Sequence, residues 1–319
     1  MSRRMGFVMD PLAAITPQKD STLAMMLAAQ ARGWELFEIR PSDMTLRDGV
    51  AAARMRAVTV HDDDHHWHDV TEVVDAPLTS LDTVMMRRDP PFDMDYVYAT
   101  HLLEQAEAAG VPVINRPRAL RDANEKLFTA WFPQCCPPTL VAARHDALRA
   151  FISEQGETIV KPLDGMGGTG VFRVHESDPN VNSVLEMLTG RYQHPIMAQR
   201  YLPAIAEGDK RILLVAGEPL EYCLARLATA GETRANLAAG GGYRAQPLSD
   251  TDRWICEQVA PTLVEYGLTF VGLDVIGDRL TEVNVTSPTC IREIARATGV
   301  NAADRLLDEV ERRLQHGTR

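Results

Sequence analysis

Short apolar runs separated by helical patterns dominate the first third of the chain. Four of these runs are typical of buried strands, and they occupy residues 5–9, 36–39, 83–86 and 111–114. Between them, residues 21–32 and 96–109 have the spacing of helices, and Gly33 and Gly110 follow as helix ends. Strands that alternate with helices in this way predict an open parallel α/β sheet.

The pattern changes from about Asn124. Further strands are predicted at residues 139–141, 158–161, 171–174, 196–201, 211–215 and 220–227. Helices are predicted near residues 147–154, 251–266 and 301–314. Residues 230–244 are poor in apolar side chains and contain three consecutive glycines, so we expect a long loop there.

Two apolar-alternating runs, 272–277 and 280–288, flank a short Gly-Asp-Arg turn and predict a hairpin. Because side chains alternate faces along a strand, Glu282 and Asn284 project from the same face, and Asp274 on the partner strand can face them. Three hard oxygen donors of this kind suit Mg2+ or Mn2+. The alternative is a solvated strand face.

A glycine-rich segment, Gly165-Met166-Gly167-Gly168-Thr169-Gly170, follows the strand that ends in Lys161-Pro162. It fits the dinucleotide pattern GxGxxG, but a strand follows it, whereas a dinucleotide site needs a helix there. A glycine loop between two strands favours a flap over nucleotide phosphates, because glycine lets the backbone approach phosphate oxygens. The alternative is a plain flexible hairpin.

Two familiar nucleotide-binding patterns are missing from the sequence. The first strand, residues 5–9, leads into Asp-Pro-Leu-Ala-Ala without a glycine turn, which argues against a nicotinamide oxidoreductase. The phosphate-binding pattern GxxxxGK[ST] does not occur either, so a Walker-type site is excluded.

Three basic residues are candidates for binding phosphate together with the flap and the hairpin. Lys126, Lys161 and Arg211 would supply the charge that binds the phosphates of ATP. A lone lysine on a strand is ordinarily solvated, but three cations near a flap favour a phosphate site. The strand end at residues 199–202 can present its backbone to an adenine edge, and Asp209 can hold a ribose hydroxyl.

Composition excludes several classes of partner. The 319 residues are 45% hydrophobic, and no apolar run of about 18 residues predicts a transmembrane helix. A net charge of −11 argues against nucleic acid or an anionic membrane as the main partner. Five cysteines without a CxxC pair favour a reducing cytoplasm.

Two further clusters of reactive side chains have ordinary explanations. Residues 61–69 read His-Asp-Asp-Asp-His-His-Trp-His-Asp and are dense in metal-binding side chains, but their position between strands favours a polar loop. Cys290 could be a nucleophile, but no histidine follows within its motif to act as a base.

The chain resembles the ATP-grasp ligases, and among them the bacterial glutathione synthetases. The resemblance runs from Met5 to about Leu314. Its most specific segments are Met-Arg-Arg-Asp-Pro-Pro-Phe-Asp at 86–93, Asn-Glu-Lys-Leu at 124–127, Lys-Pro-Leu-Asp-Gly-Met-Gly-Gly at 161–168, Asn-Leu-Ala-Ala-Gly-Gly at 236–241 and Asn-Val-Thr-Ser-Pro-Thr-Cys-Ile-Arg-Glu at 284–293. The match is looser at 62–69, at 242–246 and after Gly299.

This resemblance implies an α/β fold with three parts. An N-terminal open parallel α/β (pre-ATP-grasp) domain would span 1–123. A two-lobed ATP-grasp domain with antiparallel sheets would follow, with a small lobe at 124–200 that carries the glycine-rich flap. The large lobe at 201–319 would carry the metal site, and its 230–244 loop resembles the family's mobile lid.

The resemblance also implies the reaction. Enzymes of this family use ATP and Mg2+ or Mn2+ to join γ-glutamylcysteine and glycine into glutathione through an acyl phosphate. The alternatives are another ATP-grasp carboxylate–amine ligase, such as a D-alanine–D-alanine ligase-like enzyme, and a non-catalytic protein that senses ATP. The expected partners are small molecules, in a cytoplasmic homo-oligomer that binds neither nucleic acid nor membrane.

Roles for individual residues follow from the same resemblance and from the patterns above. ATP would be held by Lys126, Lys161, Gly165, Met166, Gly167, Gly168, Gln199, Arg200, Tyr201, Leu202 and Asp209. The metal would be held by Asp274, Glu282 and Asn284. Arg211 and Arg226 would stabilise the transferring phosphoryl group and the tetrahedral intermediate. Substrates would be bound by Asn236, Gly240, Gly241, Ser287 and Arg292, with Arg292 facing a substrate carboxylate.

Overall fold

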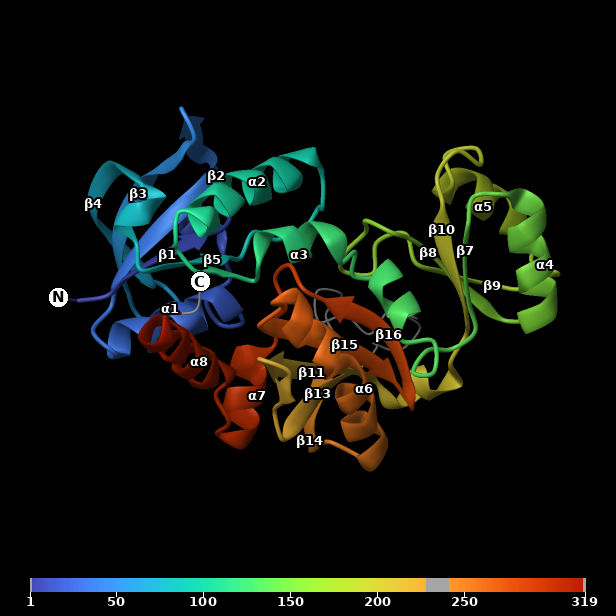
Figure 1. Cartoon of the computed structure of the whole chain (residues 1–319). Coiled ribbons are helices and arrows are strands. Elements are labelled where there is room, and N and C mark those ends of the chain that lie inside the picture. The colour runs from blue at the N-terminus through green and yellow to red at the C-terminus, as the bar shows by residue number, and fades with distance from the viewer. Residues whose placement is uncertain (1, 228–240, 318–319) are drawn as a thin grey trace.

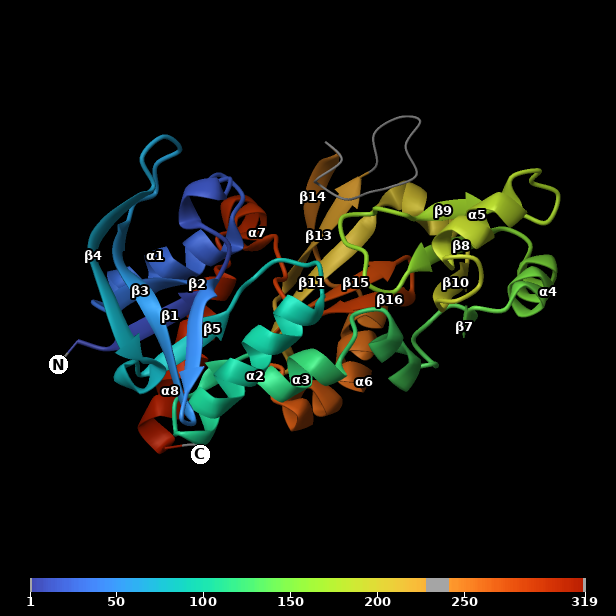
Figure 2. The same ribbon diagram turned by 90° about the horizontal axis from the view of Figure 1, so that it is seen from above.

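The computed structural model describes residues 2–227 and 241–317, and the strands in this part of the chain form three sheets. We call them the N-terminal sheet (β1–β6), the flap sheet (β7–β10) and the C-terminal sheet (β11–β16). The molecule is elongated, with the N-terminal sheet at one end, the flap sheet at the other and the C-terminal sheet between them (Figures 1 and 2). The mixed α/β class predicted from the sequence is confirmed.

The N-terminal sheet has the strand order β4-β3-β2-β1-β5-β6. Its strands are β1 (Arg4–Val8), β2 (Glu35–Arg47), β3 (Val50–Val60), β4 (His68–Pro77), β5 (Thr83–Met86) and β6 (Val113–Ile114). β1, β2, β5 and β6 are parallel, as predicted. β3 and β4 are antiparallel and were not predicted from the sequence, so the complete sheet is mixed. The cause is the turn at Asp48 and Gly49, where φ is +51° and +82°, because a two-residue turn makes consecutive strands antiparallel neighbours.

Helices cover both faces of the N-terminal sheet (Figure 2). α1 (Ser21–Ala31) packs on the face that contains Phe7, and α2 (Met94–Ala108) packs on the face that contains Val8. Consecutive residues of a buried strand point to opposite faces, which is why β1 has no polar side chain from Met5 to Val8. α1 begins as predicted, because the Asp20 carboxylate accepts a hydrogen bond from the Leu23 N–H at 2.5 Å.

The flap sheet is antiparallel and has the order β7-β10-β8-β9. Its strands are β7 (Thr139–Ala142), β8 (Thr158–Pro162), β9 (Phe172–Val174) and β10 (Ile196–Arg200), and it packs against α4 (His145–Gln155) and α5 (Val181–Leu188). The glycine-rich segment joins β8 to the antiparallel β9, so the predicted hairpin context of this loop is confirmed.

The C-terminal sheet has the order β14-β13-β11-β15-β16, with β12 paired to β11. Its strands are β11 (Asp209–Val215), β12 (Glu218–Pro219), β13 (Tyr222–Leu227), β14 (Gly242–Pro247), β15 (Phe270–Ile276) and β16 (Arg279–Asn284). Residues 242–244, which were expected to end a long loop, instead begin β14, because this segment pairs with β13 from Leu227 opposite Gly242. The loop prediction was therefore wrong for these three residues.

Three helices complete the C-terminal part: α6 (Asp250–Tyr266), α7 (Ile291–Thr298) and α8 (Ala302–His316). α6 begins at a capping box formed by Ser249 and Asp252. α7 and α8 lie against the N-terminal part (Figure 1), where Arg32 after α1 forms ion pairs with Asp304 and Asp308 of α8. None of the helices in the described ranges combines the length and apolar character that crossing a membrane requires.

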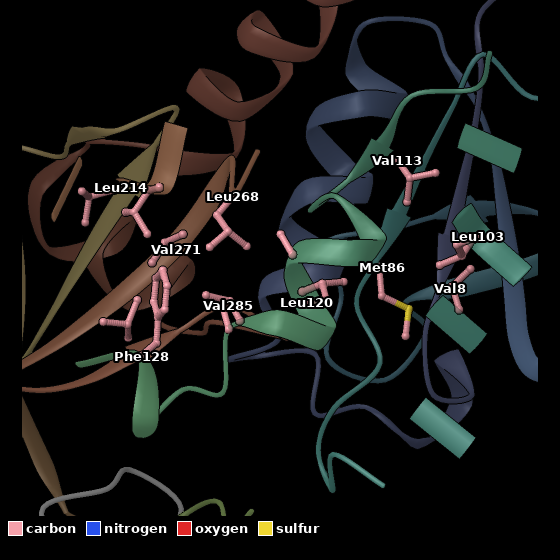
Figure 3. Close-up of a cluster of buried hydrophobic side chains, with 14 of the residues drawn as sticks. Val8, Met86, Leu103, Val113, Leu120, Phe128, Leu214, Leu268, Val271 and Val285 are labelled. Atoms are coloured by element: carbon pink, nitrogen blue, oxygen red, sulfur yellow. The ribbon is translucent and has the colours of Figure 1, made fainter. Parts of the chain in front are cut away.

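The N-terminal and C-terminal sheets share one hydrophobic core. Leu120, on α3 (Pro117–Asp122), lies between Met86 and Val113 on one side and Val285 and Val271 on the other (Figure 3). Polar contacts reinforce this junction beside the core. The Asn115 side chain donates to the carbonyls of Phe270 and Val285 and accepts from the Phe270 N–H, each at 2.8 Å. The carboxyl edge of the N-terminal sheet is thereby held against β15 and β16.

Candidate active site

A cavity of about 720 Å3 lies where the three sheets meet. This volume is within the range of small-molecule sites. The N-terminal part contributes residues near Asp10, Lys19 and Asp89 to its wall. The flap sheet contributes Lys161 and the glycine-rich loop, and the C-terminal sheet contributes the predicted metal ligands.

β15 and β16 form the predicted hairpin, and its oxygen donors all line the cavity. Asp274 lies opposite Glu282 in the ladder, and Gly272 lies opposite Asn284. Asp274, Glu282 and Asn284 therefore belong to one face, as side-chain alternation predicted. The Asn284 amide donates to the Gly272 carbonyl at 3.3 Å, which fixes its orientation. Carboxylate and amide oxygens in this arrangement suit a hard divalent cation.

The two arginines predicted to be catalytic are bonded to acidic groups of the same face. Arg211 donates to both oxygens of Asp274, at 2.6 and 3.1 Å. Arg226 lies 2.9 Å from Asp274 and donates to Asp209 at 2.5 Å. Gly272 makes room for this cluster, since a Cβ there would lie 2.9 Å from Cδ of Arg211. The arginines are thus held rigidly against the cavity.

The four charged groups of this cluster shift one another's pKa values. Burial by itself raises the pKa of Asp274, but the charges of Arg211 and Arg226 outweigh it and hold the pKa below its usual range. Burial raises the pKa of Asp209 to about 6, because Arg226 only partly offsets the desolvation and the neighbouring Asp274 adds repulsion. At neutral pH both carboxyls are ionised.

Glu282 joins the predicted metal-ligand face to the two predicted phosphate-binding lysines. Its Oε1 lies 3.3 Å from Nζ of Lys161 and 3.7 Å from Nζ of Lys126. Burial raises the pKa of Glu282, but both ammonium groups more than offset this, so the pKa is lowered. The structure therefore brings the cations and the oxygen donors to a single point, close enough to share one polyphosphate.

The glycine-rich flap lies over the same cavity. Its carbonyl at Gly165 accepts a hydrogen bond from Nζ of Lys126 at 2.6 Å. Gly167 and Gly168 have φ of +61° and +79°, which side chains with a Cβ rarely adopt. A Cβ at Gly165 would lie 2.9 Å from Cγ of Pro162. The backbone can therefore approach a ligand without steric hindrance.

The strand end at residues 199–202 forms part of the cavity wall. Gln199, Arg200, Tyr201 and Leu202 all line it. Ile159, Ile205 and Ile276 line it too, which suits a flat aromatic base. Asp209 binds Arg226 through Oδ2, while its buried Oδ1 has no hydrogen-bond partner among the described residues and can accept a hydroxyl.

The predicted substrate-binding residues have different positions. Ser287 lines the cavity, and its hydroxyl donates to the Arg87 carbonyl at 3.3 Å. Among the described residues, the cavity wall does not include Gly241 or Arg292. Arg292 forms an ion pair with Asp62 on the β3–β4 connection. Asn236, Gly240 and residues 230–240 of the expected lid lie outside the described residues.

Cys290 lines the cavity but is unsuited to nucleophilic attack. Its thiol is 1% exposed, and burial raises its pKa, although Arg211 and Arg226 partly counter this. A thiol with a raised pKa holds little of the reactive thiolate at neutral pH. All five cysteines are free and buried.

Lys19, Glu125 and Glu293 are among the residues of the cavity wall that sequence reasoning missed. Glu125 accepts hydrogen bonds from the Val285 N–H, the Thr286 N–H and the Thr286 hydroxyl, so it fixes the chain after β16. Glu293 has a buried Oε2 without a hydrogen-bond partner in residues 2–227 and 241–317, and burial raises the pKa of this carboxyl. Lys19 is close enough to Glu293 to lower that pKa in part. Glu125 belongs to the run 124–127 and Glu293 to the run 284–293. Both runs were among the segments most specific for the family resemblance, and this could have identified the two residues as functional.

Comparison with known proteins shows which family and which relatives the chain resembles. The family model for the prokaryotic glutathione synthetase N-terminal domain matches residues 4–121, and the model for the ATP-grasp domain of the same family matches residues 125–299. The glutathione synthetase of Pseudomonas syringae pv. tomato is 58% identical over 315 residues, which cover 99% of each chain. The glutathione synthetase of Vibrio vulnificus strain YJ016 is 53% identical over 315 residues, again 99% of each chain.

Solved structures share the fold at low sequence identity. The D-cycloserine synthetase DcsG superimposes with a TM-score of 0.69 at 16% identity, over 98% of this chain and 99% of the other. The D-alanyl-alanine synthetase A of Vibrio cholerae superimposes with a TM-score of 0.61 at 12% identity, over 99% of both. This similarity establishes the fold alone.

Proposed function

Since this chain belongs to the prokaryotic glutathione synthetase family, we propose that it joins γ-glutamylcysteine to glycine, using ATP and releasing ADP and phosphate. The observation that carries the proposal is the position of Glu282. It contacts both Lys126 and Lys161 beneath the glycine flap and faces Asp274 across the hairpin. A nucleotide polyphosphate and its metal can therefore share one cavity.

The reaction needs ATP because a carboxylate is anionic and has no good leaving group. The cysteinyl carboxylate of γ-glutamylcysteine attacks the γ-phosphorus, and the bond to the β-phosphate oxygen breaks to release ADP. The glycine amine then attacks the acyl phosphate, loses a proton and displaces phosphate. The protein contributes positioning and charge stabilisation to both transfers.

Lys126 and Lys161 hold the phosphates in this proposal. Both ammonium groups are nearly buried, and both are paired with Glu282. Phosphate oxygens compete with the Glu282 carboxylate for these two ammonium groups. Hydrogen bonds between an ammonium group and a phosphate oxygen are strong because both partners are charged. The flap backbone lines the same cavity and would add N–H donors for the phosphates.

Asp274, Glu282 and Asn284 fit a Mg2+ or Mn2+ ion, because all three present hard oxygens from one face of the hairpin. Such an ion supplies charge neutralisation of the phosphate oxygens when it is bound. Both Asp274 oxygens are bonded to arginines and Glu282 is bonded to lysines, so an ion shares these carboxylates with the cations around them.

Arg211 and Arg226 stabilise the negative charge that develops on the transferring phosphoryl group. Their partners, Asp274 and Asp209, hold the guanidinium groups in fixed positions before substrates bind. Preorganised donors of this kind need no rearrangement at the moment of reaction.

Lys19 and Glu293 face the substrate from the N-terminal side of the cavity. The glutamyl end of γ-glutamylcysteine carries one ammonium and one carboxylate, so a cation beside a carboxyl complements it. We assign the unpartnered Oε2 of Glu293 to the ammonium group and Lys19 to the carboxylate. Arg292 would reach a substrate carboxylate only after releasing Asp62.

A coupled assay of phosphate release tests the function. The purified protein is mixed with ATP, Mg2+, γ-glutamylcysteine and glycine, and each component is omitted in turn. We expect phosphate release only in the complete mixture, with one glutathione formed per ATP. Phosphate release with D-alanine in place of both substrates, and none with γ-glutamylcysteine, would identify a different ligase.

We also propose that the chain acts as a homo-oligomer in the cytoplasm. The free, buried thiols are compatible with a reducing compartment. Light scattering after gel filtration measures the oligomeric state, and a mass equal to one chain would contradict this part of the proposal.

A further inference from the structure

A second group of metal-binding side chains lies outside the active cavity, on the connection between β3 and β4. Nε2 of His61 lies 2.9 Å from Oδ2 of Asp69, and Nε2 of His66 lies 3.1 Å from the same oxygen. One ligand atom from each residue lies within 4.8 Å of the others. The sequence favoured a polar loop here, but folding places two imidazoles and a carboxylate at one point.

The strand pair and the loop hold this group in place. His61 directly follows β3 and Asp69 belongs to β4, and the His61 N–H donates to the Trp67 carbonyl at 2.9 Å across the loop. Asp63 accepts the N–H groups of His65 and His66, both at 2.7 Å. The rings of His61 and His66 consequently stack with centroids 5.2 Å apart.

The loop is also attached to the rest of the molecule. Nε1 of Trp67 donates to the carbonyl of Leu12 at 2.8 Å, and Asp62 pairs with Arg292. A loop anchored on both sides loses little conformational entropy when its side chains bind a ligand. The three candidate ligands are therefore arranged before an ion arrives.

We propose that His61, His66 and Asp69 bind a first-row divalent transition-metal ion, represented by Zn2+. Both Nε2 atoms point at one carboxylate oxygen, and a neutral imidazole whose proton is on Nδ1 offers Nε2 as a metal ligand, so a single divalent cation can take the place of both hydrogen bonds. Zinc accepts imidazole nitrogen and carboxylate oxygen at about 2.0–2.2 Å, so small side-chain movements are sufficient. Water completes the coordination, because all three side chains are accessible to solvent.

This site differs in chemistry from the hairpin site of the active cavity. Asp274, Glu282 and Asn284 offer oxygen atoms alone, which favour Mg2+ or Mn2+. The loop offers two imidazole nitrogens, which favour Zn2+, Ni2+ or Co2+. The two sites therefore bind different ions, and the loop site does not depend on the proposed ligase activity.

Isothermal titration calorimetry with Zn2+ tests the proposal on the full-length protein. Saturating Mg2+ is present throughout to occupy the hairpin site. We expect one Zn2+ per chain, and a loss of affinity of about tenfold or more in His66→Ala and in Asp69→Asn. His65→Ala is the matched control, because this histidine belongs to the same loop but not to the cluster, and it should bind Zn2+ as the wild type does.

Co2+ absorption gives a second measurement that reports on the ligands themselves. We expect visible bands of Co2+ bound to nitrogen and oxygen in the wild type and in Glu282→Gln, and their loss in His66→Ala. Catalytic turnover of His66→Ala with ATP and Mg2+ should equal that of the wild type, which shows that the variant is folded.

Four results would overturn the proposal. One is no Zn2+ binding in excess Mg2+, and another is equal binding by wild type and Asp69→Asn. The third is equal loss in His65→Ala and His66→Ala, which would mean that the histidines bind metal without the geometry described. Loss of the Co2+ bands in Glu282→Gln alone would assign them to the active cavity.

Discussion

Arg211 and Asp274 lie opposite each other on the antiparallel strands β11 and β15, and the guanidinium donates to both carboxylate oxygens, at 2.6 and 3.1 Å. Both side chains are 7% exposed. A residue proposed to bind the metal is therefore also the counter-ion of a residue proposed to stabilise the phosphoryl group. A change of charge at the proposed metal ligand Asp274 therefore also affects Arg211, and the reverse holds as well.

Asp274→Asn should destabilise the protein even without ligands. The change leaves Arg211 and Arg226 buried beside a neutral amide, and breaking a buried pair in this way costs about 3–5 kcal/mol. Scanning calorimetry in the presence of EDTA should record a lower Tm. Asp278→Asn, at the exposed turn of the same hairpin, is the control and should leave Tm nearly unchanged. Equal Tm values for the two variants would refute the structural role of the ion pair.

Glu282→Gln should separate nucleotide binding from metal binding. Loss of the carboxylate removes a metal ligand, so turnover should fall by about a hundredfold or more and need far more Mg2+. ATP titrated in EDTA should bind at least as tightly as to the wild type, since Lys126 and Lys161 lose their competitor. An unchanged Mg2+ dependence of turnover would contradict the metal-site assignment.

The Asp209 carboxyl should make stability fall as pH rises from about 4 to about 6. Its pKa in the folded protein is raised from 3.8 to about 6, chiefly by burial. In this window the native state keeps a proton that the unfolded chain has released, so protons favour the native state. The Tm of the wild type minus that of Asp209→Asn should therefore decrease across the window. A difference that rises with pH, or stays flat, would mean that the carboxyl is not perturbed as described.

Cys290→Ala should keep most of the wild-type turnover. The buried thiol has a raised pKa, and an acyl phosphate requires no nucleophile from the protein. Steady-state rates should be compared after circular dichroism has verified the fold. Complete loss of turnover in a folded variant would restore a chemical role for the thiol.

Asp62→Asn should lower the KM for a substrate whose carboxylate binds Arg292. The Asp62 side chain is exposed, and a pair of this kind contributes at most about 1 kcal/mol, which corresponds to a change of up to about fivefold. Arg292→Ala should raise the same KM. Asp64→Asn, in the same loop, serves as the control. If Arg292→Ala leaves every KM unchanged, Arg292 anchors the loop and does not bind substrate.

Local patterns were sufficient to predict the hairpin of β15 and β16 and which of its side chains share a face. Strand alternation alone placed Glu282 and Asn284 on one face, and the turn between the strands placed Asp274 opposite. The flap was likewise identified from its glycines and from the strand that follows it. These features depend on residues only a few positions apart, so they can be recognised from the sequence alone.

Features that depend on distant partners were missed or stayed incomplete. The strands β3 and β4, which extend the N-terminal sheet in antiparallel pairing, were missed. The turn residues Asp48 and Gly49 were a signal of this hairpin, but the apolar runs on either side of them are less regular than those of β1 and β5. Gly242 was assigned to a loop because nothing nearby marks it as the partner of Leu227. Asp62 lies 230 positions from Arg292, so their ion pair has no local signature.

The sequence by itself determined the α/β class, the donors on the hairpin and the glycine flap, because periodicity and backbone preference act over short stretches of chain. The tertiary structure decided which charges neutralise one another. It joined Glu282 to Lys126 and Lys161, tied Asp274 to Arg211, and gathered His61, His66 and Asp69 at one point. Electrostatic interaction depends on distance and burial, and both are set when sheets from different parts of the chain pack together.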